Sequence, residues 1–371
     1  MTAHPADTGT PAPVDVGPAP LGRFFTAGRA QVVDEHDRVL WQSLQQLTAH
    51  GKRFRPALLT GVYAALGGQD HPRAEKVGDA VELLHTAFVI HDDVIDGDLV
   101  RRGRPNVSGT FAARAEADGA DTVRARHYGQ AAGILAGDLA LAGAVREVAL
   151  CGASPAVVTR LLDLLEEVLH RSAAGELADV RLSLTGLATM TDVLDVAEWK
   201  TAAYSFELPL QAAALLAEAP AQVVTTLGAV GRCVGVAFQL QDDLDGVFAS
   251  SARTGKDALG DLREGKCTAL VAVARSTPQW AQLSPHVGDP TLTEAGAARA
   301  RELLVTCGAL RAVRGLVNDL RDAALAATQD LPVPAQEFLR TMIAMLLTTD
   351  QDRWTPSEGL SGRPADARGA A

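Results

Sequence analysis

The sequence predicts an all-α protein. Alanine and leucine dominate the chain, and runs of β-branched residues are short. Apolar residues recur at helical intervals, as in the series Val77, Val81, Leu84 and Phe88. No internal period of about 20 to 50 residues is visible, which argues against a helical solenoid. We therefore expect a single domain of roughly ten or more helices.

Turn-forming segments separate the expected helices along the chain. Glycine, proline, serine and aspartate gather around Pro220 and at residues 67–72, 96–105, 117–121, 151–155, 250–261 and 276–290. Residues 1–22 and 355–371 differ from the rest, because their composition leaves too little apolar surface to offset chain entropy. We expect a disordered proline-rich tail at 1–22, a folded domain at 23–354 and a second disordered tail at 355–371.

Composition excludes several classes of protein. The chain has 371 residues, with 34 lysines and arginines against 45 aspartates and glutamates, so its net charge is −11. A general binder of nucleic acid or of anionic membranes needs a dominant basic face, which this charge argues against. The four cysteines form no CxxC pair, so neither a disulfide framework nor a zinc site is indicated.

The same features favour a cytoplasmic location. The first basic residue is Arg23, which leaves no charged segment to begin a signal peptide. No uncharged apolar stretch reaches the ~18 residues of a membrane span. Widely spaced cysteines fit a reducing compartment.

The most informative local feature is an acidic cluster at the end of an apolar helix, His91-Asp92-Asp93-Val94-Ile95-Asp96. Asp92 and Asp96 are four residues apart, so they share one helix face about 6 Å apart along the axis. Two carboxylates this close repel unless a hard divalent cation lies between them, and oxygen ligands favour Mg²⁺ over zinc. A solvated acidic turn would explain this motif alone equally well.

A second acidic cluster follows 150 residues later, and it contains Asp242, Asp243 and Asp245. It too comes after an apolar helical run. Two aspartate clusters at the polar ends of buried helices indicate two walls of one cavity that holds several Mg²⁺ ions. Such an array binds a diphosphate.

Basic residues support this interpretation. Lys52 and Arg55 lie three residues apart in the segment GKRFRP, and RRGRP (101–105) follows the first acidic cluster. Arginine matches phosphate oxygens in pairs, and lysine supplies point charge. GKRFRP alone would fit an ordinary basic helix start. The remaining candidates are Lys200, Lys256 and Lys266.

These motifs together resemble the trans-isoprenyl diphosphate synthases, or polyprenyl synthetases, of the short-chain farnesyl and geranylgeranyl type. The matching stretches are GKRFRP (51–56), ELLHTAFVIHDDVID (82–96), RRGRP (101–105), GILAGDLAL (133–141), Lys200-Thr201, FQLQDD (238–243) and TGKDALGDLREGKCT (254–268). The resemblance implies the isoprenoid synthase fold, in which helices surround a deep central cavity, and it also implies a homodimer.

The resemblance also implies a role for each matching residue. Isopentenyl diphosphate would be held by Lys52, Arg55, His85 and Arg102, and the allylic diphosphate by Arg101, Lys200, Thr201, Gln239 and Lys256. Lys266 is a further candidate for substrate binding. The metal ligands would be Asp92, Asp96 and Asp242, with Asp93 and Asp243 as acidic partners beside them. The expected cofactor is Mg²⁺, about three ions per site.

The implied reaction extends a prenyl chain by five carbons. The allylic diphosphate ionises to a carbocation, the alkene of isopentenyl diphosphate attacks it, and a proton is lost to the released diphosphate. The catalytic candidates are Lys200, Arg101 and the five aspartates just named, Asp92, Asp93, Asp96, Asp242 and Asp243. Water must be kept away from the cation, so the loops at 97–105 and 250–261 are candidate lids.

Two positions depart from the family pattern. The second acidic motif has Gly246 where the family usually has its third aspartate, and Asp245 comes one place early. The stretch GELAD (175–179) has Glu176 where the family usually has glutamine, while Asp179 is retained. We expect activity, with metal affinity lowered by the glycine.

Product length is expected to depend on the residues beneath the first acidic cluster. Phe88 lies one turn below Asp92, and Ala87 beside it leaves room. In relatives an aromatic residue at either place shortens the product, so one bulky and one small residue suggest farnesyl or, with slight preference, geranylgeranyl diphosphate. Phe88 would equally fit an ordinary core position.

Two other functions remain open from the sequence. A class I terpene cyclase shares the helical fold and one acidic motif, but it should lack GKRFRP and the second acidic cluster. A non-catalytic subunit of a heteromeric synthase would account for Gly246 and Glu176. Such subunits commonly lose their acidic ligands outright, whereas Asp92, Asp96 and Asp242 are present here.

Overall fold

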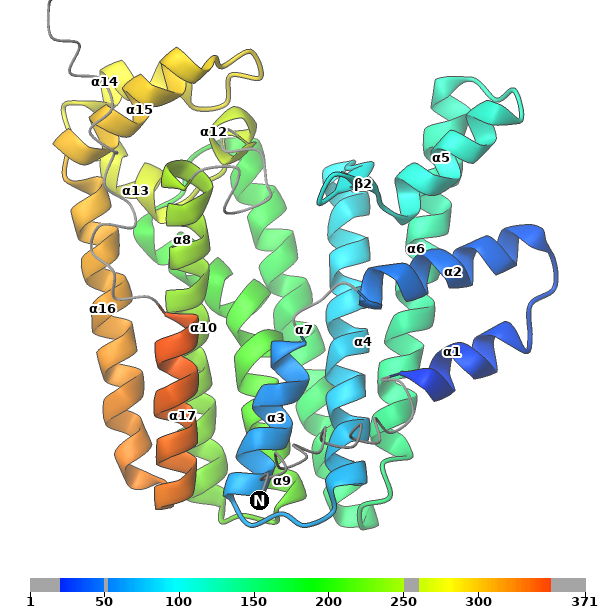
Figure 1. Ribbon diagram of the computed structural model, residues 1–371. Coiled ribbons are helices and arrows are strands. Elements are labelled where there is room, and N and C mark those ends of the chain that lie inside the picture. The colour runs from blue at the N-terminus through cyan, green and yellow to red at the C-terminus, as the bar shows by residue number, and fades with distance from the viewer. Residues whose placement is uncertain (1–20, 50–52, 250–259, 348–371) are drawn as a thin grey trace, which may run out of the picture.

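A computed structural model describes residues 21–49, 53–249 and 260–347 of the chain. Within these ranges the protein is almost entirely helical, and the longest helices run side by side in one bundle (Figure 1). The all-α prediction is confirmed, as is the expected number of roughly ten or more helices. In chain order the helices are α1 (Gly22–Arg29), α2 (Glu35–Ala49), α3 (Phe54–Ala65), α4 (His71–Asp96), α5 (Val107–Ala117), α6 (Thr122–Ala149), α7 (Pro155–Thr185), α8 (Met190–Val196), the π-helix η1 (Ala197–Glu207), α9 (Leu208–Leu216), α10 (Ala221–Phe248), α12 (Gly260–Glu264), α13 (Ala269–Arg275), α14 (Trp280–Leu283), the 3₁₀ turn η2 (Ser284–His286), α15 (Glu294–Thr306), α16 (Ala309–Ala327), the 3₁₀ turn η3 (Thr328–Asp330) and α17 (Val333–Leu346).

The helix ends fall in the turn-forming segments that the sequence predicts. Asp70 caps α4, because its side chain accepts a hydrogen bond from the backbone N–H of Arg73, and Gly97 ends the helix with a φ of 74°. Ser154 caps α7 in the same way just before Pro155. The ends of α4 and α7 are therefore fixed by local chemistry, which places the first acidic cluster on the last turn of α4.

The core of the bundle is tightly packed around α4. Leu83, Leu84 and Ile90 on α4 are almost completely buried. On the neighbouring α6, Ala136, Ala140 and other alanines at four-residue spacing are fully buried, and their small side chains let α4 and α6 approach closely. This packing makes α4 a rigid support for the residues at its upper end.

The loop at 97–105 folds as a small β-hairpin, which the all-α prediction did not include. Strand β1 (Val100–Arg101) pairs antiparallel with β2 (Arg104–Pro105). Arg102 and Gly103 form the turn with φ values of 54° and 73°. Positive φ at both central residues matches the twist of a two-residue hairpin. The hairpin keeps Arg101 close to the end of α4.

An eleven-residue π-helix, η1, follows α8, and nothing in the helical periodicity predicted it. Arg171 on α7 joins its two ends, donating to Glu198 at 3.0 Å and to Glu207 at 2.9 and 3.0 Å. Glu207 is almost completely buried. Because π-helical segments often occur at functional sites, η1 marks this part of the bundle for attention.

Several sequence predictions fall on residues outside the described ranges. These are the tail at 355–371, nearly all of the tail at 1–22, Lys52, Lys256 and most of the loop at 250–261. Of the first tail, Leu21 and Gly22 are described: Leu21 is 3% exposed and α1 begins at Gly22. These two residues, which the sequence assigned to the tail, thus belong to the packed part of the described chain.

One helix in the described ranges, α10, is long and apolar enough to cross a membrane. In the structure 56% of its apolar window is buried inside the bundle, where it packs against η1, α9 and α16. Arg232 also interrupts the apolar run. These features are those of a core helix in a bundle, and α10 carries the second acidic cluster at its end.

Candidate active site

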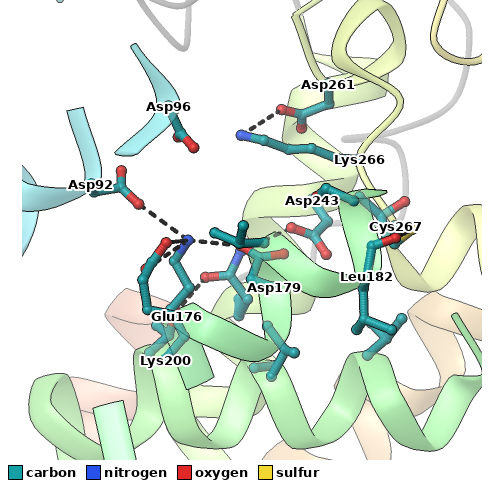
Figure 2. A pocket seen from close by; sticks show the side chains of 18 of the residues that line it. Asp92, Asp96, Glu176, Asp179, Leu182, Lys200, Asp243, Asp261, Lys266 and Cys267 are labelled. Atoms are coloured by element: carbon teal, nitrogen blue, oxygen red, sulfur yellow. Dashed lines mark hydrogen bonds and ion pairs between the residues drawn. The ribbon is translucent and has the colours of Figure 1, made fainter. Parts of the chain in front are cut away.

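The upper end of the bundle contains a cavity of about 340 Å³. Residues from α4, α7, α8, η1, α10 and the segment around α12 line it (Figure 2). The sequence-predicted residues that line it are Asp92, Asp96, Lys200, Thr201, Gln239, Asp242, Asp243 and Lys266. Both acidic clusters and part of the predicted basic set therefore share one cavity, although they are far apart in the sequence.

Asp92 and Asp93 on α4 are held by Arg101 from the β-hairpin. The Nε of Arg101 donates to Asp93 at 2.7 Å, and one of its terminal nitrogens donates to Asp92 at 3.2 Å. Asp93 is 3% exposed, and burial raises its pKa while Arg101 opposes the shift. Arg101 therefore supports the first acidic cluster from the side.

Asp96 lies at the mouth of the cavity. Partial burial raises its pKa to about 6, and the neighbouring Asp92 acts in the same direction. Lys200 and Lys266 oppose the shift. A bound cation would stabilise the charged form of Asp96 strongly, because it would relieve the repulsion from Asp92.

Lys200 on η1 occupies the centre of the acidic site (Figure 2). Its Nζ lies 3.1 Å from Asp92, 3.0 Å from Glu176 and 2.7 Å from Asp179. Burial alone would lower the pKa of Lys200, but the three carboxylates outweigh it and raise the pKa. The ammonium group joins α4, α7 and η1, and it shows that this cavity accommodates a cation among carboxylate oxygens.

Lys200 reaches this position because η1 lies directly against α7. A β-carbon at Gly175 would come within 2.5 Å of the backbone nitrogen of Lys200, so only glycine permits the contact. The next residue, Thr201, donates a hydrogen bond to Gln239 on α10 at 2.8 Å. The π-helix thus presents two consecutive polar residues to the cavity.

The second wall of the cavity comes from α10. Gln239 donates to Asp243 at 2.9 Å, one helical turn away. Burial raises the pKa of Asp243 to about 7, and Asp261 and Asp242 add to the shift. Asp242 lies beside it on the cavity surface.

Lys266 and Asp261 complete this side of the cavity. The Nζ of Lys266 lies 3.7 Å from Asp261 and 3.3 Å from Glu264. Burial alone would lower the pKa of Lys266, but Asp261 and Glu264 outweigh it and raise the pKa. Lys266, which the sequence predicted as a site residue, lines the cavity. Asp261 lines it too, but it was not singled out from the sequence.

Two of the residues predicted to hold isopentenyl diphosphate, Arg55 and His85, lie in a second group that does not line this cavity. Arg55 donates two hydrogen bonds to Ser205, at 2.9 and 3.0 Å, and its guanidinium lies over the ring of Tyr204. His85 lies 3.3 Å from the Tyr204 hydroxyl. Burial lowers the pKa of His85 well below its usual value, and nearby arginines add to the shift. Arg102 is exposed at the hairpin turn.

The two candidate chain-length residues lie below the first acidic cluster. Ala87 is 1% exposed. Phe88 packs edge-to-face on Tyr204, with ring centroids 4.9 Å apart. Neither lines the cavity described above. Phe88 is therefore linked through Tyr204 to the Arg55 and His85 group.

Sequence reasoning missed the partners that hold the predicted residues. Tyr204 and Ser205 are the main ones, and the turn of η1 brings both to Arg55. Their position just after Lys200-Thr201 was the available signal. Asp179 was noted only as retained, yet it makes the shortest contact with Lys200.

The donor set of the cavity fits divalent metal ions that are bound together with a phosphate. Among the described residues, no three carboxylate, imidazole or thiol groups stand close enough to hold a metal ion by themselves. Mg²⁺ commonly keeps several waters and is held by one or two carboxylates together with substrate phosphates. This cavity has carboxylates on facing walls and lysines between them, which matches a site where carboxylates and substrate phosphates share the metal ions.

In this all-helical bundle, two aspartate walls, two lysines and further polar residues surround one cavity. This arrangement defines a class of protein, an enzyme that binds a diphosphate. Comparison with known proteins agrees. The family model of the polyprenyl synthetases matches residues 37–304, and the chain belongs to this family. It is accordingly a prenyltransferase.

The relatives include enzymes with several product lengths. A geranylfarnesyl diphosphate synthase of Aeropyrum pernix is 32% identical over 74% of this chain and 81% of its own. A geranylgeranyl diphosphate synthase of Mycobacterium tuberculosis is 32% identical over 78% and 79%. The crystal structure of a geranylgeranyl pyrophosphate synthase from Corynebacterium glutamicum, complexed with isoprenyl diphosphate and magnesium, has a TM-score of 0.81 at 29% identity and covers 88% of this chain and 96% of that chain.

Proposed function

We propose that this protein condenses isopentenyl diphosphate with an allylic diphosphate, using about three Mg²⁺ ions, to give geranylgeranyl or farnesyl diphosphate. The observation that carries the proposal is the cavity, in which Asp92 and Asp96 on α4 face Asp242 and Asp243 on α10 with Lys200 between the walls. The Corynebacterium glutamicum enzyme with magnesium and isoprenyl diphosphate adds support.

The allylic diphosphate binds at the cavity, where the chain supplies both charge and hydrogen bonds. Lys200 and Lys266 bring positive charge from η1 and from the segment after α12. Thr201 and Gln239 offer polar groups from η1 and α10. Asp92, Asp96 and Asp242 would hold the metal ions, which would supply positive charge to stabilise the departing diphosphate.

Condensation then exchanges one bond for another. The allylic C–O bond breaks, the alkene of isopentenyl diphosphate forms the new C–C bond, and one proton leaves to restore a double bond. We assign the proton to the released diphosphate. Apolar side chains that line the cavity, including Leu182, Val193 and Val196, keep water away from the cation.

Isopentenyl diphosphate is assigned to the group around Arg55. Arg55 supplies charge, and Ser205 and Tyr204 hold its guanidinium in place. His85 is neutral at pH 7 because burial and the nearby arginines lower its pKa. It therefore contributes a hydrogen bond without adding charge. Three further assignments rest on the family pattern alone, those of Lys52, Arg102 and Lys256.

We also propose a cytoplasmic homodimer. Exposed apolar side chains on α6 support the dimer, because Ile134 and Leu135 are 48% and 57% exposed on adjacent positions. Size-exclusion chromatography with light scattering tests it. A mass of twice the 38.8 kDa chain is expected, and a single-chain mass would contradict it.

An elongation assay tests the proposed activity. Purified protein is supplied with Mg²⁺, isopentenyl diphosphate and, in turn, dimethylallyl, geranyl or farnesyl diphosphate, and the products are sized by chromatography. Elongation to geranylgeranyl or farnesyl diphosphate is expected. Failure with every primer would overturn the proposal and leave the non-catalytic subunit, while a cyclic hydrocarbon from a single primer would indicate a terpene cyclase.

A further inference from the structure

The first turn of α3 has a conformation that its own sequence does not favour. Arg53, which directly precedes the helix, has a φ of 47°, in the left-handed region that residues other than glycine rarely adopt. Arg55 is helical although Pro56 follows it, and a residue before proline tends to avoid the helical region. Tertiary contacts must therefore hold this turn in place.

Asp79 on α4 supplies such a contact. Its Oδ1 accepts a hydrogen bond from a terminal nitrogen of Arg53 at 2.7 Å, and its Oδ2 accepts one from the backbone N–H of Leu21 at 3.0 Å. The side chains of Arg53 and Asp79 are only 27% and 23% exposed, so solvent screens this ion pair less than one on the open surface. Both carboxylate oxygens are thus engaged, and Asp79 has a fixed orientation.

The residue beside Asp79 brings α3 and α4 close together. Gly78 is buried, and a β-carbon there would lie 3.3 Å from the Cβ of Pro56. The first turn of α3 therefore rests on two consecutive residues of α4, through packing at Gly78 and through the ion pair at Asp79.

Arg55 lies on the same turn and belongs to the group assigned to isopentenyl diphosphate. Its guanidinium donates two hydrogen bonds to Ser205 and lies over the ring of Tyr204. A guanidinium recognises phosphate oxygens through a rigid fork of N–H groups, so binding depends on its exact position. A change in the backbone at Arg53 would move this fork away from Ser205.

We propose that Asp79 is a positioning residue for isopentenyl diphosphate. By pairing with Arg53, it holds the left-handed residue at the start of α3 and thereby the guanidinium of Arg55. This rests on the proposed function, because it takes Arg55 as a ligand of isopentenyl diphosphate. Neither Asp79 nor Arg53 lines the cavity that contains the acidic clusters, so the effect is confined to one of the two substrates.

Steady-state elongation assays, with each substrate varied in turn, test the inference. We expect Asp79→Asn to raise the KM for isopentenyl diphosphate about tenfold, and to change kcat and the KM for the allylic diphosphate by less than about twofold. Circular dichroism fixes an assay temperature at which every variant is folded. Asp322→Asn, which removes the ionic partner of Arg321 on α16, is the matched control and should leave both KM values unchanged.

Two substitutions at Arg53 separate the ion pair from the backbone conformation. Both Arg53→Ala and Arg53→Gly remove the ion pair, but only glycine adopts a φ of 47° without strain. We expect the KM for isopentenyl diphosphate to rise about tenfold in Arg53→Ala and only about threefold in Arg53→Gly. A purely structural role for the ion pair would not give this order in KM.

The outcomes separate this inference from the proposed function. If the wild type elongates no primer, the proposed function fails, and the role of Asp79 fails with it. If the wild type elongates and Asp79→Asn has an unchanged KM for isopentenyl diphosphate, or raises both KM values equally, only the role of Asp79 is overturned. A lower KM in Asp79→Asn would also overturn it, because Arg53 would then be a direct ligand that Asp79 restrains. Equal KM values in Arg53→Ala and Arg53→Gly would overturn positioning through the backbone.

Discussion

The two acidic walls of the cavity are built from the same residue type but are neutralised differently. On α4, Asp92 and Asp93 contact cationic side chains, Arg101 and Lys200. On α10, Asp243 accepts a hydrogen bond from the neutral Gln239, and burial raises its pKa to about 7. Among the described residues, Asp92 and Asp93 on the first wall are thus paired with cationic side chains, whereas Asp243 on the second wall is held by a neutral amide.

A repeated acidic motif therefore does not have a single role in this cavity. Lys200 belongs to the first wall through Asp92 and to α7 through Glu176 and Asp179. Lys266 belongs to the second wall through Asp261.

Asp92→Asn should lower kcat/KM about 100- to 1000-fold. It removes one proposed metal ligand and one partner of Lys200 at the same time. Steady-state elongation assays measure the loss, and circular dichroism should show an unchanged helical content. Asp322→Asn, on the exposed surface of α16, is the control and should retain activity. A near-normal rate for Asp92→Asn would refute the metal assignment.

Lys200→Met should lower kcat about 100-fold, because the charge at the centre of the cavity is lost while most of the side-chain volume remains. The same assay measures it. Lys76→Met replaces a partly exposed lysine on α4 whose Nζ donates to the carbonyl of Leu150, and it should have little effect. Equal activity of the two variants would place Lys200 outside the catalytic group.

Arg171→Met should lower the free energy of unfolding by about 2 to 3 kcal/mol. Glu207 is 3% exposed and would lose its closest cationic partner, although Arg232 at 3.6 Å compensates in part. Denaturant unfolding measures the change. Arg299→Met removes an exposed ion pair with Glu302 and should cost much less. Similar values for both would mean that Arg171 does not secure η1.

Phe88→Ala should change product length more than rate. Loss of the ring that packs on Tyr204 opens space below the first acidic cluster, and the main product should gain one or more five-carbon units. Chromatography of the products measures this. Phe111→Ala removes an equal volume from α5 and should leave the distribution unchanged. An unchanged distribution in Phe88→Ala would assign Phe88 to the core.

The sequence predicted the fold class and the two walls because their signals are local. Asp70 and Ser154 mark helix starts, and four-residue spacing marks the face that carries Asp92 and Asp96. The π-helix was not predicted, since helical periodicity does not separate it from an α-helix over eleven residues.

The long-range contacts were the other part that the sequence did not reveal. Asp261 reaches Gly246 only because α12 is anchored to the chain near Gly288. The shared contact of Glu176 and Asp179 with Lys200 depends on the close approach of η1 to α7 at Gly175. Such contacts come from tertiary packing, which no single stretch of sequence encodes.

The central claim is that the two walls act on one diphosphate. A double-mutant cycle with Asp92→Asn and Asp242→Asn, measured as kcat/KM for elongation, tests it most directly. We predict that kcat/KM falls about 100-fold or more in each single variant. In the double variant it should fall no more than about tenfold below the value of the less active single variant. Losses that multiply in full, or an Asp242→Asn variant with wild-type activity, would contradict the claim.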